Sequence, residues 1–212
     1  MKIERISKKD RRNVIIDFDD DNQLIINYEV FLKNGLRRGM DLSSDRFSFL
    51  VEENEKHKIK IEAINYLAKR IHSEKELRIK LQRKKHNPDL INESIDDLKE
   101  RGLIDDYKYS LIFTDEKVRL KLWGEKKIKA ELMKNGVSNE VISKVMIEKF
   151  SGENNIENAV ELAGKKIKSL SYKNLDKRKL AEKVYSYLAS KGYDYQVSRE
   201  AVKKVLNEDF FE

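Results

Sequence analysis

The sequence predicts a mainly α-helical protein, with three tandem three-helix modules in an elongated, curved array behind a small N-terminal unit that holds a β-hairpin. Three observations predict this fold class. Apolar residues recur at helical spacing from residue 59 to the end of the chain. The charged stretch SEKELRIKLQRKK at Ser73 is nearly repeated 51 residues later, as GEKKIKAELMKNG at Gly124. Strong N-cap residues recur at the same interval.

The N-terminal unit is expected to span residues 1–58 and to mix β and α structure. Two runs rich in β-forming residues, NVIIDF and QLIINY, flank the turn-forming DDDN and predict the hairpin. Two helices are expected to follow, near residues 28–35 and 43–57, the second capped by Ser43 or Ser44. This unit carries no net charge, so the whole excess of seven positive charges lies in the rest of the chain.

The three modules are expected to span residues 59–105, 106–152 and 153–212. The first helix of each module is expected to have one apolar face. In the first module this face consists of Ile64, Leu67, Ala68 and Ile71, in the second of Tyr107, Leu111, Thr114, Val118 and Leu122, and in the third of Ile156, Val160, Ala163, Ile167 and Leu170. The second and third helices keep a common register. Shifts of 51 and then 56 residues align Leu77, Leu81, Leu90, Ile91 and Ile95 with Ile128, Leu132, Val141, Ile142 and Met146, and then with Val184, Leu188, Val197, Ser198 and Val202. Three copies of one repeated unit explain this register.

The helix ends are also predicted from local signals. Ser73 and Glu76 have the spacing of a capping box in front of Leu77. The third helices are expected to begin at N-caps, which are Asn87, followed by Pro88, then Ser138 and Asp194. Helices are expected to end at Gly102, Gly136 and Gly192, and Asp105 is expected to cap the helix that follows RGLI.

Composition narrows the class of protein. The chain has 212 residues, of which 39% are charged and 39% apolar, so several small cores suit it better than one deep core. Disorder is the rival interpretation, but the sustained helical spacing argues against it. There is no cysteine, and neither a signal peptide nor a long apolar run is present. We therefore expect a cytoplasmic protein with no membrane span.

Catalytic chemistry is not indicated. His57, His72 and His86 have no metal-ligand spacing and are expected to be surface residues. The chain contains neither a glycine-rich phosphate loop nor a cysteine nucleophile. The acidic residues Asp96 and Asp97 are expected on a solvated helix face. We therefore predict no catalytic residue, no metal site and no cofactor.

Positive charge recurs in every module. Lys and Arg number eight against two acids in residues 69–85, seven against two in 117–134, and nine against two in 165–191. Helical geometry turns the middle-helix residues Lys75, Arg83, Lys126 and Lys134 away from the apolar face. Two interpretations of these outward-facing basic residues remain: they form a binding surface, or they are simply a solvated helix face. Aromatic residues are sparse there, with only Trp123 and Tyr185 nearby, which argues against a platform that stacks single-stranded bases.

The sequence resembles the RecX family of recombinase regulators over about residues 59–210. The family's first module carries a Ser-Glu-x-Glu-Leu stretch and then Gly-Leu-Ile-Asp-Asp with a Tyr. These residues are here Ser73, Glu74, Glu76 and Leu77, then Gly102, Leu103, Ile104, Asp105, Asp106 and Tyr109. Ser110 stands where the family usually has Ala. We interpret the RGLIDD stretch as structural, with Leu103 and Ile104 buried where the first two modules meet.

The resemblance implies a non-enzymatic regulator that binds RecA recombinase and the RecA–single-stranded-DNA filament and inhibits the recombinase, ATPase and co-protease activities. We expect the protein to be a monomer. Bare DNA is expected to bind weakly and without sequence preference. Candidate filament contacts are the basic residues of the middle helices, namely Lys75, Arg78, Arg83, Lys84, Lys126, Lys129 and Lys134. A DNA-binding transcription regulator is the alternative, although the basic residues are mostly Lys, which suits phosphate better than base edges.

Overall fold

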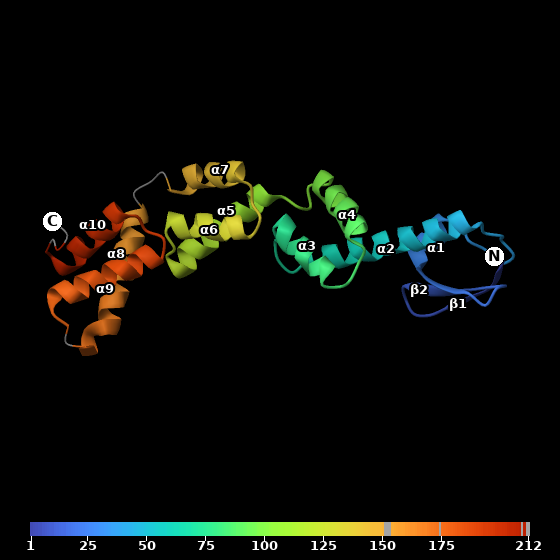
Figure 1. Cartoon of the computed structure of the whole chain (residues 1–212), viewed down its shortest axis with the longest axis horizontal. Coiled ribbons are helices and arrows are strands. Elements are labelled where there is room, and N and C mark those ends of the chain that lie inside the picture. Colours follow the sequence, from blue (N-terminus) through green and yellow to red (C-terminus); the bar gives the residue numbers. More distant parts are fainter. Residues whose placement is uncertain (151–153, 174, 209, 211–212) are drawn as a thin grey trace. The chain divides into compact units, whose positions relative to one another are not determined.

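The computed structural model describes residues 1–150, 154–173, 175–208 and 210 (Figure 1). These residues form a three-stranded sheet, ten α-helices and one short 3-10 helix, so the mainly α fold is confirmed. The chain divides into two compact units. The first contains Met1–His72 and Glu76–Ile104, and the second contains Ser73–Lys75 and Asp105–Glu212.

The N-terminal sheet is antiparallel, in the order β1 (Ile3–Lys8), β2 (Asn13–Phe18), β3 (Gln23–Asn27). Strands β2 and β3 are the expected hairpin, with Val14 opposite Ile26 and Ile16 opposite Leu24. Strand β1 was not expected. Its sequence, IERISK, buries only Ile3 fully, so it lacks the clear alternation that marks a half-buried strand.

The two helices that follow are α1 (Tyr28–Lys33) and α2 (Ser44–Leu67). Helix α2 begins where expected, because the Ser43 hydroxyl accepts a hydrogen bond from the Arg46 amide at 3.2 Å. It also continues past residue 58 without a break. The helix expected near residues 43–57 and the first helix of the first module are therefore one continuous helix. No Gly or Pro lies between its ends to stop it. On its inner face, the buried Asn54 side chain bonds the Asn27 amide and the carbonyl of residue 25, at 2.8 and 2.9 Å, and so covers the free edge of β3.

The rest of the first unit contains most of α3 (Glu74–Gln82) and all of α4 (Pro88–Glu100). Both helices pack on the C-terminal half of α2 around one apolar cluster, which consists of Ile59, Ala63, Leu77, Leu81, Leu90, Ile91, Ile95, Leu98 and Ile104. Helix α4 begins as predicted, since the Asn87 side chain accepts from the Asp89 amide and Pro88 takes the first helical position. It ends before Gly102, whose φ of +67° favours glycine.

The second unit contains α5 (Asp106–Lys121), α6 (Glu125–Lys134), α7 (Asn139–Phe150), α8 (Asn154–Leu170), the 3-10 helix η1 (Ser171–Lys173), α9 (Lys177–Ser190) and α10 (Tyr195–Leu206). The repeat register is confirmed by burial. Ile128, Leu132, Val184 and Leu188 are fully enclosed, as Leu77 and Leu81 are in the first unit. The predicted caps are present as well, because the Ser138 and Asp194 side chains accept from the amides of Val141 and Val197.

Helix α5 departs from the expected face. Thr114 and Leu122 are buried as predicted, but Tyr107 is exposed and bonds Glu148 through its hydroxyl at 2.6 Å. Tyr109 and Ser110 are buried in its place. The apolar residues of this helix lie on more than one face, so spacing alone did not identify the buried one.

Candidate functional surface

The predicted contact residues of the first unit differ in exposure and in whether their side chains are hydrogen-bonded within the chain. Arg83 and Lys84 follow the last residue of α3 and are exposed. Arg78 is partly buried and donates to the Asn92 side chain on α4. Arg83 and Lys84 are therefore the members of this group that are placed to meet a partner.

In the second unit, Lys126 and Lys134 are exposed near the two ends of α6, as expected. Lys129 lies between them and forms an ion pair with Glu125 at 2.7 Å. An exposed pair of this kind contributes little stability, but it neutralises the charge that a partner could use. Lys126 and Lys134 are the stronger candidates on this helix.

Lys75 does not project freely. Its ammonium donates to the Lys134 carbonyl at 3.1 Å, and its side chain packs where a Cβ at Gly136 would lie. Next to it, the Ser73 hydroxyl donates to the Asn135 carbonyl at 2.8 Å. The segment Ser73–Lys75 thus completes the C-terminal end of α6, where backbone carbonyls lack partners within the helix. Lys75 is exposed as expected, but its ammonium is engaged within the chain, and its role as a contact stays a prediction.

The acidic pair of RGLIDD has a structural role. Asp105 accepts from the amides of Tyr107 and Lys108, both at 2.9 Å, and so caps α5 as predicted. Asp106 accepts from the Glu74 amide at 2.8 Å, a contact that spacing in the sequence does not reveal. Ser110 donates to the Asp106 carbonyl at 2.6 Å, one helical turn back.

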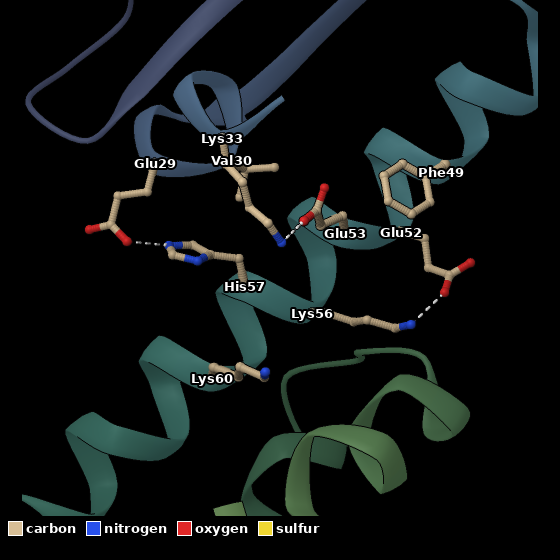
Figure 2. A pocket seen from close by; sticks show the side chains of 9 residues that line it. All are labelled: Glu29, Val30, Lys33, Phe49, Glu52, Glu53, Lys56, His57 and Lys60. Carbon is tan, nitrogen blue, oxygen red and sulfur yellow. Dashed lines mark hydrogen bonds and ion pairs between the residues drawn. The ribbon is translucent and has the colours of Figure 1, made fainter. Parts of the chain in front are cut away.

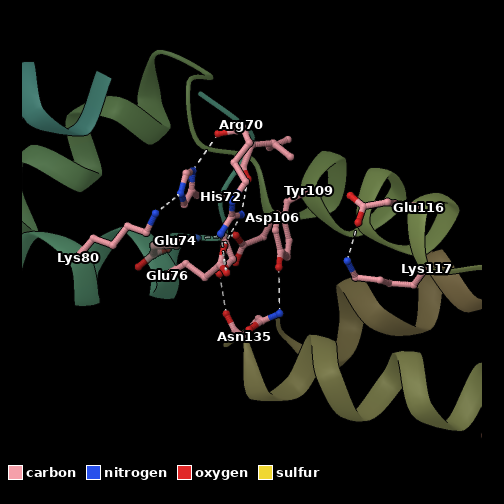
Figure 3. Close-up of polar contacts among 12 residues, drawn as sticks. Arg70, His72, Glu74, Glu76, Lys80, Asp106, Tyr109, Glu116, Lys117 and Asn135 are labelled. Carbon is pink, nitrogen blue, oxygen red and sulfur yellow. Dashed lines mark hydrogen bonds and ion pairs between the residues drawn. The ribbon is translucent and has the colours of Figure 1, made fainter. Parts of the chain in front are cut away.

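Figure 3 shows the polar contacts around these residues. In the second unit, the Asn135 amide donates to the Tyr109 hydroxyl at 2.9 Å. In the first unit, Arg70 forms an ion pair with Glu76 at 3.0 Å. The capping box of Ser73 and Glu76 stays a prediction.

His72 is buried, with 1% of its surface exposed, so the expectation of a surface histidine is wrong for this residue. Its Nδ1 contacts the Arg70 carbonyl at 2.8 Å and its Nε2 contacts the Lys80 ammonium at 2.7 Å (Figure 3). A neutral ring with the proton on Nδ1 satisfies both contacts. Burial lowers the pKa of His72, and the nearby Arg70 and Lys80 charges act in the same direction.

His57 and His86 are also less exposed than expected. His86 lies between two glutamates of α2, at 3.8 Å from Glu55 and 3.3 Å from Glu62. Asp97, expected on a solvated face, instead pairs with Lys60 at 2.9 Å and with Arg101 at 3.0 Å, and these contacts lower its pKa. All three side chains serve contacts between neighbouring helices of the first unit.

A hollow of about 430 Å³ lies between α1 and α2 (Figure 2). Its charged side chains largely pair with one another, since Lys33 binds Glu53, Lys56 binds Glu52 at 2.7 Å, and His57 lies 3.9 Å from Glu29. These pairs leave little charge to attract a polar ligand. Across the described parts of the chain, no group of three acidic, histidine or cysteine side chains is arranged to hold a metal ion.

Two glycines join α6 to α9 within the second unit. The Gly124 amide donates to the Lys191 carbonyl at 2.8 Å, and the Lys126 amide donates to the Gly192 carbonyl at 3.1 Å. A Cβ at Gly124 would lie 2.6 Å from the Gly192 backbone, so only glycine fits this close approach. Beside the joint, the buried Tyr193 hydroxyl donates to the Leu122 carbonyl at 2.9 Å, and burial raises the pKa of this phenol.

Aromatic side chains and lysines alternate on the second unit far more than the sequence suggested. Lysine ammonium groups lie about 5 Å from ring centres in the pairs Phe113–Lys117, Trp123–Lys127 and Tyr187–Lys191, at 5.0 Å in each case. Each pair has a spacing of four residues, which brings two side chains together on a helix, as in Phe113–Lys117 on α5; Trp123 itself lies just before the N-terminus of α6. That spacing is the sequence signal that could have revealed them.

Comparison with known proteins decides the family. Models of the first, second and third three-helix domains of RecX match residues 61–98, 105–146 and 153–202. A "Regulatory protein RecX" from Clostridium botulinum (strain Alaska E43 / Type E3) is 33% identical over 210 residues, which cover 98% of this chain and 96% of that protein. The chain belongs to the RecX family.

Solved RecX structures share the fold. A crystal structure of a regulatory protein RecX matches with a TM-score of 0.76 and 22% identity, over 96% of this chain and 98% of the other. RecX from Lactobacillus salivarius matches with a TM-score of 0.63 and 25% identity, over 72% of this chain and 97% of the other. The three matched segments leave residues 1–60 outside the RecX helical domains, while the curated relative extends over them.

The residues that carry the resemblance to RecX are mostly interior or capping residues. Leu77 and Ile104 are buried, Gly102 adopts positive φ, and Asp105 caps α5. Leu103 is the exception, because half of its surface is exposed although it was expected to be buried. Among the helices that the structure describes, none has the length and apolar character to cross a membrane.

Proposed function

We propose that this chain binds RecA recombinase and the RecA–single-stranded-DNA filament, and that it inhibits the recombinase, ATPase and co-protease activities of RecA by occupying the filament groove. The observation that carries the proposal is the match of all three RecX helical domains to one chain. The regulatory name of the relatives supports a role in control rather than in catalysis. We also propose that it acts in the cytoplasm as a monomer.

The basic residues proposed to meet the filament are Arg83, Lys84, Lys126 and Lys134. All four are exposed, and within the described residues none of them forms an ion pair with a carboxylate. Unpaired surface charge attracts an anionic partner over distance and mainly raises the association rate. Lys75, Arg78 and Lys129 are weaker candidates, because each is engaged within the chain.

The test measures ATP hydrolysis by RecA on single-stranded DNA with increasing amounts of this chain, at low and moderate salt. The wild-type chain is expected to inhibit hydrolysis and to show no ATPase activity of its own. A variant with Gln at residues 83, 84, 126 and 134 should inhibit less and lose most of the salt dependence. The matched control carries Gln at Lys144, Lys165, Lys179 and Lys204, which removes the same charge from residues that pair with acids.

Two results would contradict the proposal at different levels. If the wild-type chain leaves RecA hydrolysis unchanged at every ratio, the proposed inhibition is wrong. If the chain inhibits but the two quadruple variants behave alike, the partner is right and the four basic residues are not the contact. Sedimentation velocity of the free chain and of its mixture with RecA measures the monomeric state and the association directly.

A further inference from the structure

A second hollow of the first unit, of about 350 Å³, lies between the β1–β2 turn, the start of α1 and the C-terminal half of α2. This volume falls within the range of small-molecule sites, which is about 300–1,000 Å³. We call it the arginine hollow and define it by six of its lining residues, which are Arg11, Arg12, Tyr28, Ile61, Ile64 and Asn65.

The turn that carries the two arginines is held in one shape. The Asp10 carboxylate accepts hydrogen bonds from the amides of Arg12 and Asn13 at 2.7 and 2.9 Å. The Arg12 carbonyl accepts from the Tyr28 amide at 2.7 Å, which ties the turn to the start of α1. The backbone of the arginines is therefore in place before a ligand binds, and a preorganised site loses less entropy on binding.

The guanidinium groups of Arg11 and Arg12 are not neutralised within the chain. Both residues are exposed, and in the part of the chain that the structure describes neither forms an ion pair with a carboxylate. On the neighbouring strand β1, Arg5 instead pairs with Asp17 at 2.9 Å. Guanidinium groups bind phosphate and carboxylate oxygens through paired, charge-assisted hydrogen bonds, so the two arginines favour an anionic ligand.

The wall that α2 contributes is largely apolar. Helical steps of 100° place Ile61 and Ile64 on the side of α2 opposite the buried Ile59, so these side chains line the hollow and not the core. Asn65 lies beside them and is exposed, and its side chain makes no hydrogen bond to another described residue. This wall therefore offers apolar contact together with one amide that can both donate and accept.

Tyr28 adds an aromatic surface. Its side chain is 49% exposed, and its ring stacks on the Phe31 ring with centres 6.1 Å apart. Because this stacking fixes the plane of the ring, Tyr28 suits a planar group of a ligand.

Glu29 and His57 separate the arginine hollow from the hollow of about 430 Å³ between α1 and α2, since the two residues line both. They lie 3.9 Å apart and face one another in Figure 2. Glu29 supplies the one carboxylate among the residues that line the arginine hollow. The two hollows differ in charge, because the lysines of the larger one pair with glutamates, whereas Arg11 and Arg12 do not.

We propose that the arginine hollow binds a nucleoside phosphate. The two guanidinium groups donate to phosphate oxygens, the base lies against the Tyr28 ring and the isoleucines, and the Asn65 amide bonds the edge of the base. Pyrophosphate alone uses only the arginines, and a nucleoside alone uses only the ring and the apolar wall. An acidic peptide also meets the arginines, but it has no base for Tyr28 and Asn65. This site lies in the first unit and stands apart from the proposed inhibition of RecA.

The test follows backbone amide resonances of the isotope-labelled full chain by NMR, without RecA or DNA, during a titration with ADP. ADP should shift the amide resonances of Arg12, Tyr28 and Asn65, and the dependence of the shifts on concentration gives the dissociation constant. Adenosine, pyrophosphate and hexaglutamate are titrated in parallel. We expect ADP to bind about tenfold or more tightly than each of the three, because ADP alone carries both the phosphates and the base.

Matched variants separate the hollow from general positive charge. R11Q/R12Q should weaken ADP binding by about tenfold or more, because charge-assisted hydrogen bonds to the phosphates are lost. R37Q/R38Q removes equal charge from another adjacent pair of exposed arginines in the same unit, and it should change the affinity less than about twofold.

A second pair of variants tests the ring. Tyr28→Leu should weaken ADP binding and leave pyrophosphate binding unchanged. Phe49→Leu replaces a ring of similar exposure, 48%, that lines the neighbouring hollow, and it should leave ADP binding as in the wild type. Circular dichroism of each variant verifies that it is folded.

The proposal is overturned if millimolar ADP shifts none of the amide resonances of the hollow. Equal weakening by the two double variants would also overturn it, since only net charge would then matter. Pyrophosphate binding as tight as ADP binding would reduce the hollow to a general anion site. Hexaglutamate binding as tight as ADP binding, with shifts of the same resonances, would assign the hollow to an acidic segment of a protein partner instead.

Discussion

Replacing Gly192 by alanine tests the glycine joint between α6 and α9. Gly192 has a φ of +94°, and a Cβ there would lie 2.3 Å from the Lys127 amide nitrogen and 2.5 Å from the Lys127 Cβ. The first of these atoms belongs to the backbone of α6, so a rotamer change cannot relieve the clash. We expect Gly192→Ala to push the two helices apart.

The magnitude follows from two costs. An L-residue at positive φ costs roughly 1–2 kcal/mol, and overpacking of a close contact costs roughly 1–3 kcal/mol more. The sum is about 2–5 kcal/mol. With an m-value of about 1–3 kcal/mol per molar urea, the unfolding midpoint of the second unit should fall by about 1 M or more.

The assay is urea unfolding followed by Trp123 fluorescence, since Trp123 adjoins the joint and reports on the second unit. Gly164→Ala is the matched control, because Gly164 lies within α8 and has open space around its Cβ position. That change should stabilise the unit by about 0.5–1 kcal/mol. A Gly192→Ala midpoint equal to that of the wild type would refute the close approach of the two backbones.

Three further predictions concern the interior and the caps. Leu132→Ala should lower the free energy of unfolding by about 2–5 kcal/mol in chemical denaturation, because Leu132 is fully buried. As a control, Met133→Ala changes an exposed neighbour and should alter that free energy by no more than about 0.5 kcal/mol. A Leu132→Ala variant as stable as the wild type would contradict the repeat register. Asp106→Ala should cost about 1 kcal/mol through loss of its bond to the Glu74 amide, and Asp106→Asn should cost less and leave RecA inhibition intact, since an amide oxygen also accepts. Folding lowers the pKa of His72, so the stability that its neutral ring contributes is complete above about pH 6.5 and should fall as the pH drops below that value. The measurement is the free energy of unfolding as a function of pH. If a His72→Gln variant loses stability at acid pH in the same way as the wild type, His72 is not responsible for the loss.

Helix ends and buried faces of the second and third helices were predictable because their causes are local. An N-cap such as Asn87 or Asp194 acts on an amide two or three residues away, and a glycine such as Gly102 or Gly192 is needed where the last turn reverses. The repeat register strengthened the N-cap predictions, since that signal occurred three times, at Asn87, Ser138 and Asp194. The α5 face was less well predicted because its apolar residues do not form a single stripe.

The candidate surface was predicted only in part. Exposure of Lys126 and Lys134 follows from helical geometry relative to the buried leucines, whereas Arg83 and Lys84 lie just beyond the end of α3. The engagement of Lys75 does not, because its partner, the Lys134 carbonyl, is 59 residues away. Which lysine is paired and which is free depends on neighbours that only the folded chain supplies.

The sequence by itself determined the family, the three helical modules, most helix ends and the recurrence of positive charge, since all of these depend on residues within a few turns of one another or on a repeat of that local pattern. Tertiary structure decided the contact of Lys75 with the Lys134 carbonyl and the close approach of Gly124 and Gly192. The physical reason is distance along the chain. A contact between residues more than fifty positions apart forms only when helix packing brings their backbones together, and no local preference encodes that meeting.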